Sequence, residues 1–134
     1  MKHLIITLCL TLFIGLTACK NDKQSVGDIK IVSPQEMQSL LKLDDVQLVD
    51  VRTPEEYKDG FIANAQNIDF KSPTFDEDIK KLDKAKPVIV YCKSGKRSAK
   101  SAQKLKEEGF TIIYDLEGGF IRWQHDSMEI ETEE

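Results

Sequence analysis

Short runs of apolar residues alternate along the chain with segments whose apolar residues recur at helical spacing. Residues 46–51, 88–91 and 111–114 form such runs, and residues 29–31 alternate apolar and polar side chains. Near-continuous apolar runs are typical of parallel strands that are covered on both faces. Strands of this kind in alternation with helices predict an α/β domain with an open, mostly parallel sheet flanked by helices.

The predicted helices lie between these strands, and two of them begin with the same pattern. Ser33 and Thr53 are each followed by proline and, at the third position, by glutamate. A hydroxyl residue followed three positions later by glutamate forms a capping box, and proline is favoured at the first helical position. We therefore expect helices after Ser33 and Thr53, the second ending at Gly60, and further helices over residues 76–82, 99–108 and 120–124.

The first residues have the pattern of a targeting segment. A basic start, residues 1–3, precedes the apolar residues 4–16, which are too few to span a bilayer comfortably. Residues 16–19, Leu-Thr-Ala-Cys, resemble the lipobox of bacterial lipoproteins, which implies cleavage before Cys19 and lipid attachment to its thiol. An ordinary secretory signal and an N-terminal transmembrane anchor are the alternatives.

These observations divide the chain into four parts and predict its location. We expect a lipoprotein signal peptide over residues 1–18, a flexible tether over 19–28, a folded domain over 29–126 and a frayed acidic tail over 127–134. The protein would then be held by lipid at the bacterial cell envelope, on its periplasmic or surface side.

Composition and charge fit one ordinary globular domain. The 134 residues are 40% hydrophobic and 31% charged, and the formal net charge of −4 argues against nucleic acid as a partner. Neither a cofactor nor a metal is predicted. Cys9 and Cys19 belong to the targeting segment, so Cys92 is the single cysteine of the folded part. A solitary thiol outside the cytosol favours a functional cysteine.

Cys92 is the candidate nucleophile, because it lies where a strand ends and a helix begins. Loop N–H groups and the start of a helix favour an anion, and Lys93, Lys96 and Arg97 add positive charge. Such surroundings favour a reactive thiolate and attract a small anionic substrate. A surface turn with a buried, inert cysteine is the alternative.

A second polar group follows another predicted strand. Asp50 and Arg52 lie at the end of the apolar run 46–51. In open parallel sheets, ligands bind beyond the carboxyl ends of the strands, which is where Cys92 is also expected. The pattern therefore predicts one anion site with Cys92 at its centre and Asp50 and Arg52 as candidate supporting residues.

Four stretches of the folded part form a combined pattern: residues 50–57 (DVRTPEEY), 60–65 (GFIANA), 92–98 (CKSGKRS) and 116–119 (LEGG) with Trp123. Together they resemble the single-domain rhodaneses, the thiosulfate-type sulfurtransferases and their relatives. Phe61 replaces a usual histidine, and Ala63 and Asn64 replace proline and glycine, which implies altered packing. Ser94 stands where some members have a lysine thought to favour thiosulfate, so the identity of the anionic sulfur donor stays open.

The resemblance implies sulfur transfer through a persulfide on Cys92. The donor would be thiosulfate or a similar anion, and the acceptor cyanide, another thiol or a protein. The substrate would be held by the loop that carries Lys93, Ser94, Gly95, Lys96, Arg97 and Ser98.

Two supporting roles follow from the resemblance and from position. Arg52 would pair with a nearby acidic group and fix the sheet edge, with direct substrate contact as the alternative. Ser98 is expected at the N-cap or first position of the helix.

Loop length separates this prediction from phosphatase chemistry. Protein phosphatases of related fold place five residues between cysteine and arginine, whereas four separate Cys92 from Arg97. The shorter loop makes a tighter cradle, sized for a sulfur atom on the cysteine. The alternative in another class is a module that carries persulfide, senses oxidants or docks a partner without turnover.

Overall fold

The computed structural model describes residues 27–133. Its five strands form one sheet in the order β1-β5-β4-β2-β3, and every neighbouring pair is parallel. The strands are β1 (Asp28–Val32), β2 (Gln47–Asp50), β3 (Gln66–Asn67), β4 (Val88–Tyr91) and β5 (Ile112–Leu116). The predicted fold class is confirmed, and the parallel sheet carries no antiparallel strand within residues 27–133.

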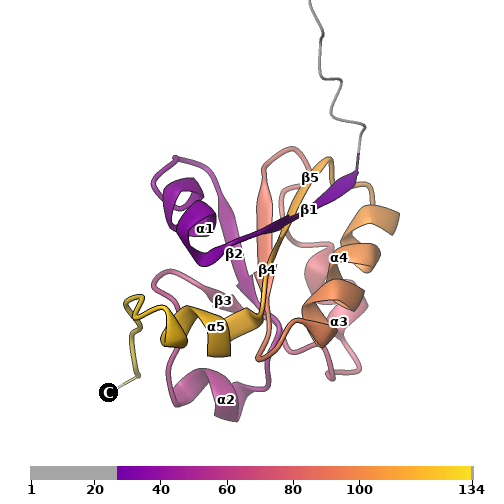
Figure 1. Cartoon of the computed structure of the whole chain (residues 1–134). Coiled ribbons are helices and arrows are strands. Elements are labelled where there is room, and N and C mark those ends of the chain that lie inside the picture. The colour runs from indigo at the N-terminus through magenta and orange to yellow at the C-terminus, as the bar shows by residue number, and fades with distance from the viewer. Residues whose placement is uncertain (1–26, 134) are drawn as a thin grey trace, which may run out of the picture.

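Helices cover both faces of the sheet (Figure 1). The helices α3 and α4 lie on one face, and α1, α2 and α5 lie toward the other. Their bounds are α1 (Pro34–Leu40), α2 (Pro54–Lys58), α3 (Phe75–Ile79), α4 (Lys96–Glu107) and α5 (Gly119–His125). Since β4 is central and is covered on both faces, all four of its residues are buried.

Both predicted capping boxes are present. The Ser33 and Thr53 hydroxyls accept the N–H groups of Glu36 and Glu56, and each glutamate accepts the N–H of its cap residue. Pro34 and Pro54 occupy the first helical position in each case. These local hydrogen bonds replace the ones that the first turn of a helix lacks, which is why the pattern predicts a helix start well.

Several element boundaries differ from the sequence prediction. The helix predicted over 99–108 begins at Lys96, because Gly95 takes a left-handed conformation (φ 103°) and turns the chain directly into the helix. The helix predicted over 76–82 spans Phe75–Ile79, and β5 extends to Leu116. Asp28, assigned to the tether, is the first residue of β1.

The acidic tail is not frayed where it leaves α5. Glu131 and Phe61 form an antiparallel bridge with two hydrogen bonds of 2.8 Å, and the Trp123 indole N–H donates to the Glu129 carbonyl at 2.8 Å. A buried indole N–H needs an acceptor, and the tail supplies it. The expectation of a frayed tail is therefore wrong for this segment.

The predicted targeting segment and tether, including Cys19, lie outside the described residues, apart from Gly27 and Asp28. Among residues 27–133, no helix combines the length and apolar character that crossing a membrane requires.

Candidate active site

Cys92 immediately follows β4 and is 1% exposed. Its sulfur atom accepts a hydrogen bond from the Gly95 N–H at 3.1 Å. An inert cysteine in apolar packing would have no such donor aimed at it. The structure therefore places the sulfur against an amide that stabilises negative charge, as expected for a nucleophilic thiolate.

The loop that follows Cys92 turns into α4 within a few residues. Gly95 is the N-cap of this helix and provides no side-chain hydrogen bond to its first turn. Lys96 and Arg97 are its first two residues, and the first turn contains no acidic residue. A helix start with cations and without an acidic cap favours a bound anion. Ser98 is the third helical residue, not the N-cap or first residue that the sequence suggested.

The start of α5 holds the loop from the other side. Phe120 and Ile121 donate their N–H groups to the carbonyls of Cys92 and Lys93, at 2.7 and 3.1 Å. Gly119 has a φ of 62°, and a Cβ atom there would lie 2.5 Å from the Cys92 oxygen and 2.6 Å from the Lys93 oxygen. Only glycine permits this approach. With those carbonyls bound to α5, the Gly95 N–H is free to face the sulfur.

Arg97 is held by a glutamate from α2. Its guanidinium makes two hydrogen bonds to Glu56, at 2.7 and 2.9 Å. These bonds, followed by the Thr53 backbone N–H, lower the pKa of Glu56 to about 2 against the effect of burial. Lys93 and Lys96 are exposed and form no ion pair among the described residues. The positive charge that remains available to a substrate is therefore that of the two lysines.

Asp50 and Arg52 form a buried ion pair beside the loop. The Arg52 Nη2 atom lies 2.6 Å from Asp50 and 2.7 Å from the Gly60 carbonyl, and the two side chains are 4% and 0% exposed. The guanidinium also lies 4.0 Å from the centre of the Phe120 ring. The predicted pairing of Arg52 with an acidic group is confirmed. It joins the end of β2 to the loop before β3 and to α5.

A hollow of about 220 Å³ opens beside the loop. It has an apolar wall from α5 and charged residues from the Cys92 loop, from α2 and its C-terminal end, and from the segment after β2. It is lined by Arg52, Glu56, Asp59, Lys93, Phe120, Ile121 and Gln124. It gives a substrate room next to an exposed loop lysine.

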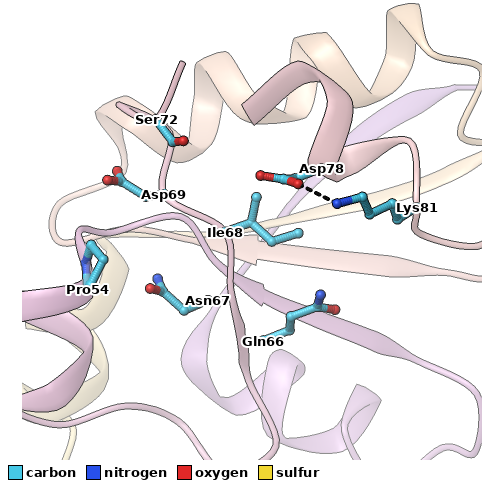
Figure 2. Close-up of a pocket in the computed structure, with 8 residues that line it drawn as sticks. All are labelled: Pro54, Gln66, Asn67, Ile68, Asp69, Ser72, Asp78 and Lys81. Atoms are coloured by element: carbon cyan, nitrogen blue, oxygen red, sulfur yellow. Dashed lines mark hydrogen bonds and ion pairs between the residues drawn. The ribbon is translucent and has the colours of Figure 1, made fainter. Parts of the chain in front are cut away.

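A second hollow, of about 380 Å³, lies near β3 and α3 (Figure 2). It does not include Cys92 or its loop, and Asp78 and Lys81 on its wall pair with each other. Asn67 donates its amide to the carbonyls of Asp50 and Arg52 and so serves the backbone. Within residues 27–133, no three His, Cys, Asp or Glu side chains are grouped to hold a metal ion.

The sequence analysis missed three features of the site: Glu56, the start of α5, and Asp115. Glu56 was assigned only to a cap, and its partner lies 41 positions away in sequence. The strand predicted over residues 111–114 ends before Asp115 and so leaves this residue out. The available signal was a carboxylate placed directly after the apolar run 111–114. Charged residues are rarely buried, so one that continues a buried strand points to a special role.

Comparison with known proteins agrees with this geometry. Residues 33–126 match the family model of the rhodanese-like domain. The thiosulfate sulfurtransferase GlpE of Coxiella burnetii is 40% identical over 95 residues, which cover 71% of this chain and 87% of that protein.

Two solved structures are similar in both sequence and fold. The rhodanese-related protein of Thermoplasma volcanium superimposes with a TM-score of 0.70 at 30% identity, covering 78% of this chain and 99% of that one. The rhodanese-like domain protein of Staphylococcus aureus does so with a TM-score of 0.67 at 32% identity and the same coverage. The loop, the ion pair beside it and these likenesses lead to one conclusion: the chain belongs to the family of rhodanese-like domains, as a sulfurtransferase.

Proposed function

We propose that the protein transfers sulfane sulfur from a small anionic donor to a thiophilic acceptor through a persulfide on Cys92. The observation that carries the proposal is the hydrogen bond from the Gly95 N–H to the Cys92 sulfur at the start of α4. It supplies a preorganised donor for a negatively charged sulfur.

In the first step, the Cys92 thiolate attacks the outer sulfur of the donor. A Cys92–sulfur bond forms, the sulfur–sulfur bond of a thiosulfate breaks, and sulfite leaves with the electron pair. Lys93 in the loop and Lys96 at the start of α4 are exposed and attract the thiosulfate dianion. The Gly95 N–H holds Cys92 in place, and the remaining N–H groups at the helix start stabilise the terminal sulfur of the persulfide.

In the second step, a cyanide ion or a thiolate attacks the terminal sulfur. The new bond forms as the persulfide bond breaks, and Cys92 leaves as a thiolate, so the protein returns to its starting state. Thiosulfate is one candidate donor, because a similar protein is a thiosulfate sulfurtransferase. Polysulfide is another, because the chain is 32% identical to the polysulfide-sulfur transferase of Wolinella succinogenes.

Steady-state kinetics test this proposal. Wild-type protein is mixed with thiosulfate or polysulfide and with cyanide, and thiocyanate is measured over many equivalents of protein. We expect repeated turnover by wild type and none by Cys92→Ser. Full activity of the serine variant would refute the proposal. One equivalent of product without further turnover would instead support the carrier function.

We also propose that Cys19 carries a lipid that anchors the domain at the cell envelope. The support is the Leu-Thr-Ala-Cys sequence after an apolar segment. Cells that process lipoproteins are grown with a palmitate analogue that can be tagged. Labelling of wild type and loss of label in Cys19→Ser are expected. Equal labelling of both proteins would contradict the anchor.

A further inference from the structure

The hollow of about 220 Å³ beside the Cys92 loop has both polar and apolar walls. Asp59 stands at the C-terminal end of α2, Lys93 directly follows the nucleophile, and Ile121 and Gln124 come from α5. Drug-sized ligands occupy roughly 300–1,000 Å³, so this smaller hollow suits a molecule of the size of a single amino acid. Its place next to the catalytic loop makes it a candidate site for a reactant.

Two of the four charged residues that line the hollow are neutralised inside the protein. Arg52 is paired with a buried aspartate, and Glu56 is paired with the arginine of the loop. Lys93 and Asp59 are exposed, and neither has an ion-pair partner within residues 27–133. The hollow therefore offers a ligand one cation and one carboxylate.

Helix α2 does not account for the carboxylate of Asp59. Asp59 is the C-cap of this helix, and the C-terminal end of a helix carries partial negative charge. A carboxylate is not stabilised at such an end, whereas a positively charged group is. Asp59 and the end of α2 together therefore favour a ligand with a cationic group.

The apolar part of the hollow is the side chain of Ile121, which is 50% exposed. Its N–H donates to the Lys93 carbonyl at 3.1 Å, which fixes Ile121 beside the loop. Gln124 is exposed three positions further along α5 and so lies on the same face of the helix. A short aliphatic segment of a ligand would cover Ile121 and remove apolar surface from water.

We propose that this hollow binds the sulfur acceptor, and that the acceptor is an amino-acid thiol in its zwitterionic form. The ammonium group faces Asp59, the carboxylate faces Lys93, and the carbon chain covers Ile121. The carboxylate contact brings the acceptor thiol to the nucleophile, because Lys93 and Cys92 are adjacent in the loop. The inference rests on the proposed function and names the acceptor of its second step.

Lys93 can serve both steps, because sulfite leaves before the acceptor binds. The acceptor thiol gives its proton to water, and the resulting thiolate attacks the terminal sulfur of the Cys92 persulfide. A new sulfur–sulfur bond forms as the bond between Cys92 and the terminal sulfur breaks. Cys92 leaves with the electron pair as a thiolate, and the acceptor departs as a persulfide.

Discharge of the preformed persulfide by four related thiols tests the proposal without the donor step. L-Cysteine carries both charges, its methyl ester only the ammonium group, N-acetylcysteine only the carboxylate, and N-acetylcysteine amide neither. Each thiol is compared between wild type and variant, so its own reactivity cancels. Cyanide is the reference acceptor, because it has none of the groups that the hollow recognises.

Asp59→Asn should slow discharge by the two acceptors with an ammonium group about threefold to fivefold, as expected for an ion pair at the surface. The other two thiols and cyanide should react as they do with the control Glu55→Gln, which removes a carboxylate from the same helix outside the hollow. Equal losses for cysteine and N-acetylcysteine, or no loss for either, would overturn the proposal.

Lys93→Gln should give the complementary result. Compared with Lys96→Gln, which removes a nearby cation outside the hollow, it should slow cysteine and N-acetylcysteine more than the methyl ester. Ile121→Ser should slow all four thiols and leave cyanide unchanged. A loss in Lys93→Gln that is the same with and without the acceptor carboxylate would contradict the assigned orientation.

Binding of S-methyl-L-cysteine gives a reading that does not depend on sulfur transfer. Titrated into the persulfide-free protein, it should shift the amide NMR signals of Asp59, Ile121 and Gln124 to saturation, and Asp59→Asn should raise its Kd about threefold to fivefold. The absence of saturable shifts at these residues would overturn the inference. A persulfide that cyanide cannot discharge would refute the proposed function, and the titration would still decide whether the hollow binds such a zwitterion.

Discussion

At the scale of single residues, the site combines burial with a directed hydrogen bond. Cys92 is 1% exposed, yet its sulfur faces the Gly95 N–H at 3.1 Å. Forming a buried thiolate without a hydrogen-bond donor costs free energy, whereas a thiolate that accepts an amide hydrogen bond at a helix start is stabilised. The residues around Cys92 have two kinds of role: some hold the Gly95 N–H in place, and others change the charge near the sulfur.

Glu56 holds Arg97, and its removal should loosen the first turn of α4. We expect Glu56→Gln to lower the free energy of unfolding by about 1–2 kcal/mol near neutral pH, because a charge-assisted pair is lost. The native pKa of Glu56 is about 2, below its ordinary value of 4.5, so its contribution is complete above pH 4.5 and is lost as pH falls toward 2.

Chemical denaturation across this pH range measures the effect. The matched control is Glu55→Gln, which removes an exposed charge from the same helix and should change stability by less than about 0.5 kcal/mol. Equal losses in the two variants would show that the pair with Arg97 does not stabilise the fold.

Asp115 should make the fold less stable at neutral pH than in mild acid. Its native pKa of about 6 exceeds the ordinary value of 3.8, so the native state binds the proton more tightly. Its contribution is favourable at low pH and is lost as pH rises from about 4 to 6, by at most about 3 kcal/mol.

Urea denaturation of wild type and Asp115→Asn tests this sign. The variant should lack the decline and should gain stability relative to wild type as pH rises through 6. A constant difference between the two proteins across this range would contradict the raised pKa.

At the scale of elements, two helix starts meet around one loop. α4 supplies the Gly95 N–H to the sulfur, and α5 supplies the Phe120 and Ile121 N–H groups to the loop carbonyls. The loop is thereby fixed from both sides, and its amides need not reorganise when charge develops on the sulfur.

Replacing Gly119 by alanine should separate these two helix starts. The new Cβ would lie 2.5 Å from the Cys92 carbonyl oxygen, which is backbone and can move only with the loop. We expect sulfur transfer to fall about tenfold or more, equivalent to about 1.4 kcal/mol of lost transition-state stabilisation.

Gly109→Ala is the matched control, because Gly109 also has a left-handed φ, of 93°, but a Cβ there meets nothing within 4 Å. Both variants should lose about 1 kcal/mol of stability from backbone strain. Only Gly119→Ala should also lose activity, as measured by kcat/KM. Unchanged activity in Gly119→Ala would refute the role given to this contact.

At the scale of the whole molecule, the strand order brings the site together. β4 lies between β5 and β2, so the carboxyl ends of these strands place Cys92 near Asp115 on one side and near Asp50 and Arg52 on the other. Ligands of open parallel sheets bind at such ends.

The tail should stabilise this arrangement from outside the sheet. Removing residues 129–134 deletes the Glu129 acceptor of the Trp123 indole and the two hydrogen bonds between Glu131 and Phe61. We expect a loss of about 1–3 kcal/mol in the free energy of unfolding.

Thermal or urea unfolding of the truncated protein measures this loss. Changing Glu133 to Gln is the control, since it alters tail charge without removing these backbone contacts. A truncated protein as stable as the full chain would restore the view of the tail as a frayed end.

The elements that were predictable from sequence are those encoded by neighbouring residues. The apolar run before Cys92 and the caps at Ser33 and Thr53 each act within a few positions, and all were found. The strand order was not predictable, because runs of valine and isoleucine do not specify which strands are neighbours.

Contacts between residues that are far apart in the sequence were not predictable for the same reason. The pair of Glu56 and Arg97 depends on how α2 and α4 are placed in space, and the position of Asp115 beside Val90 depends on the register of β5 against β4. The predicted position of Ser98 in the helix is wrong, because the helix start depends on the left-handed conformation of Gly95. A glycine permits this conformation but does not impose it.

The central claim is that Cys92 carries sulfur, and the mass of the intact protein after mixing with thiosulfate or polysulfide tests it most directly. We predict that wild type gains one sulfur atom, that cyanide removes it, and that Cys92→Ser gains none. A wild-type mass that stays unchanged with both donors, or an equal gain in Cys92→Ser, would contradict the account.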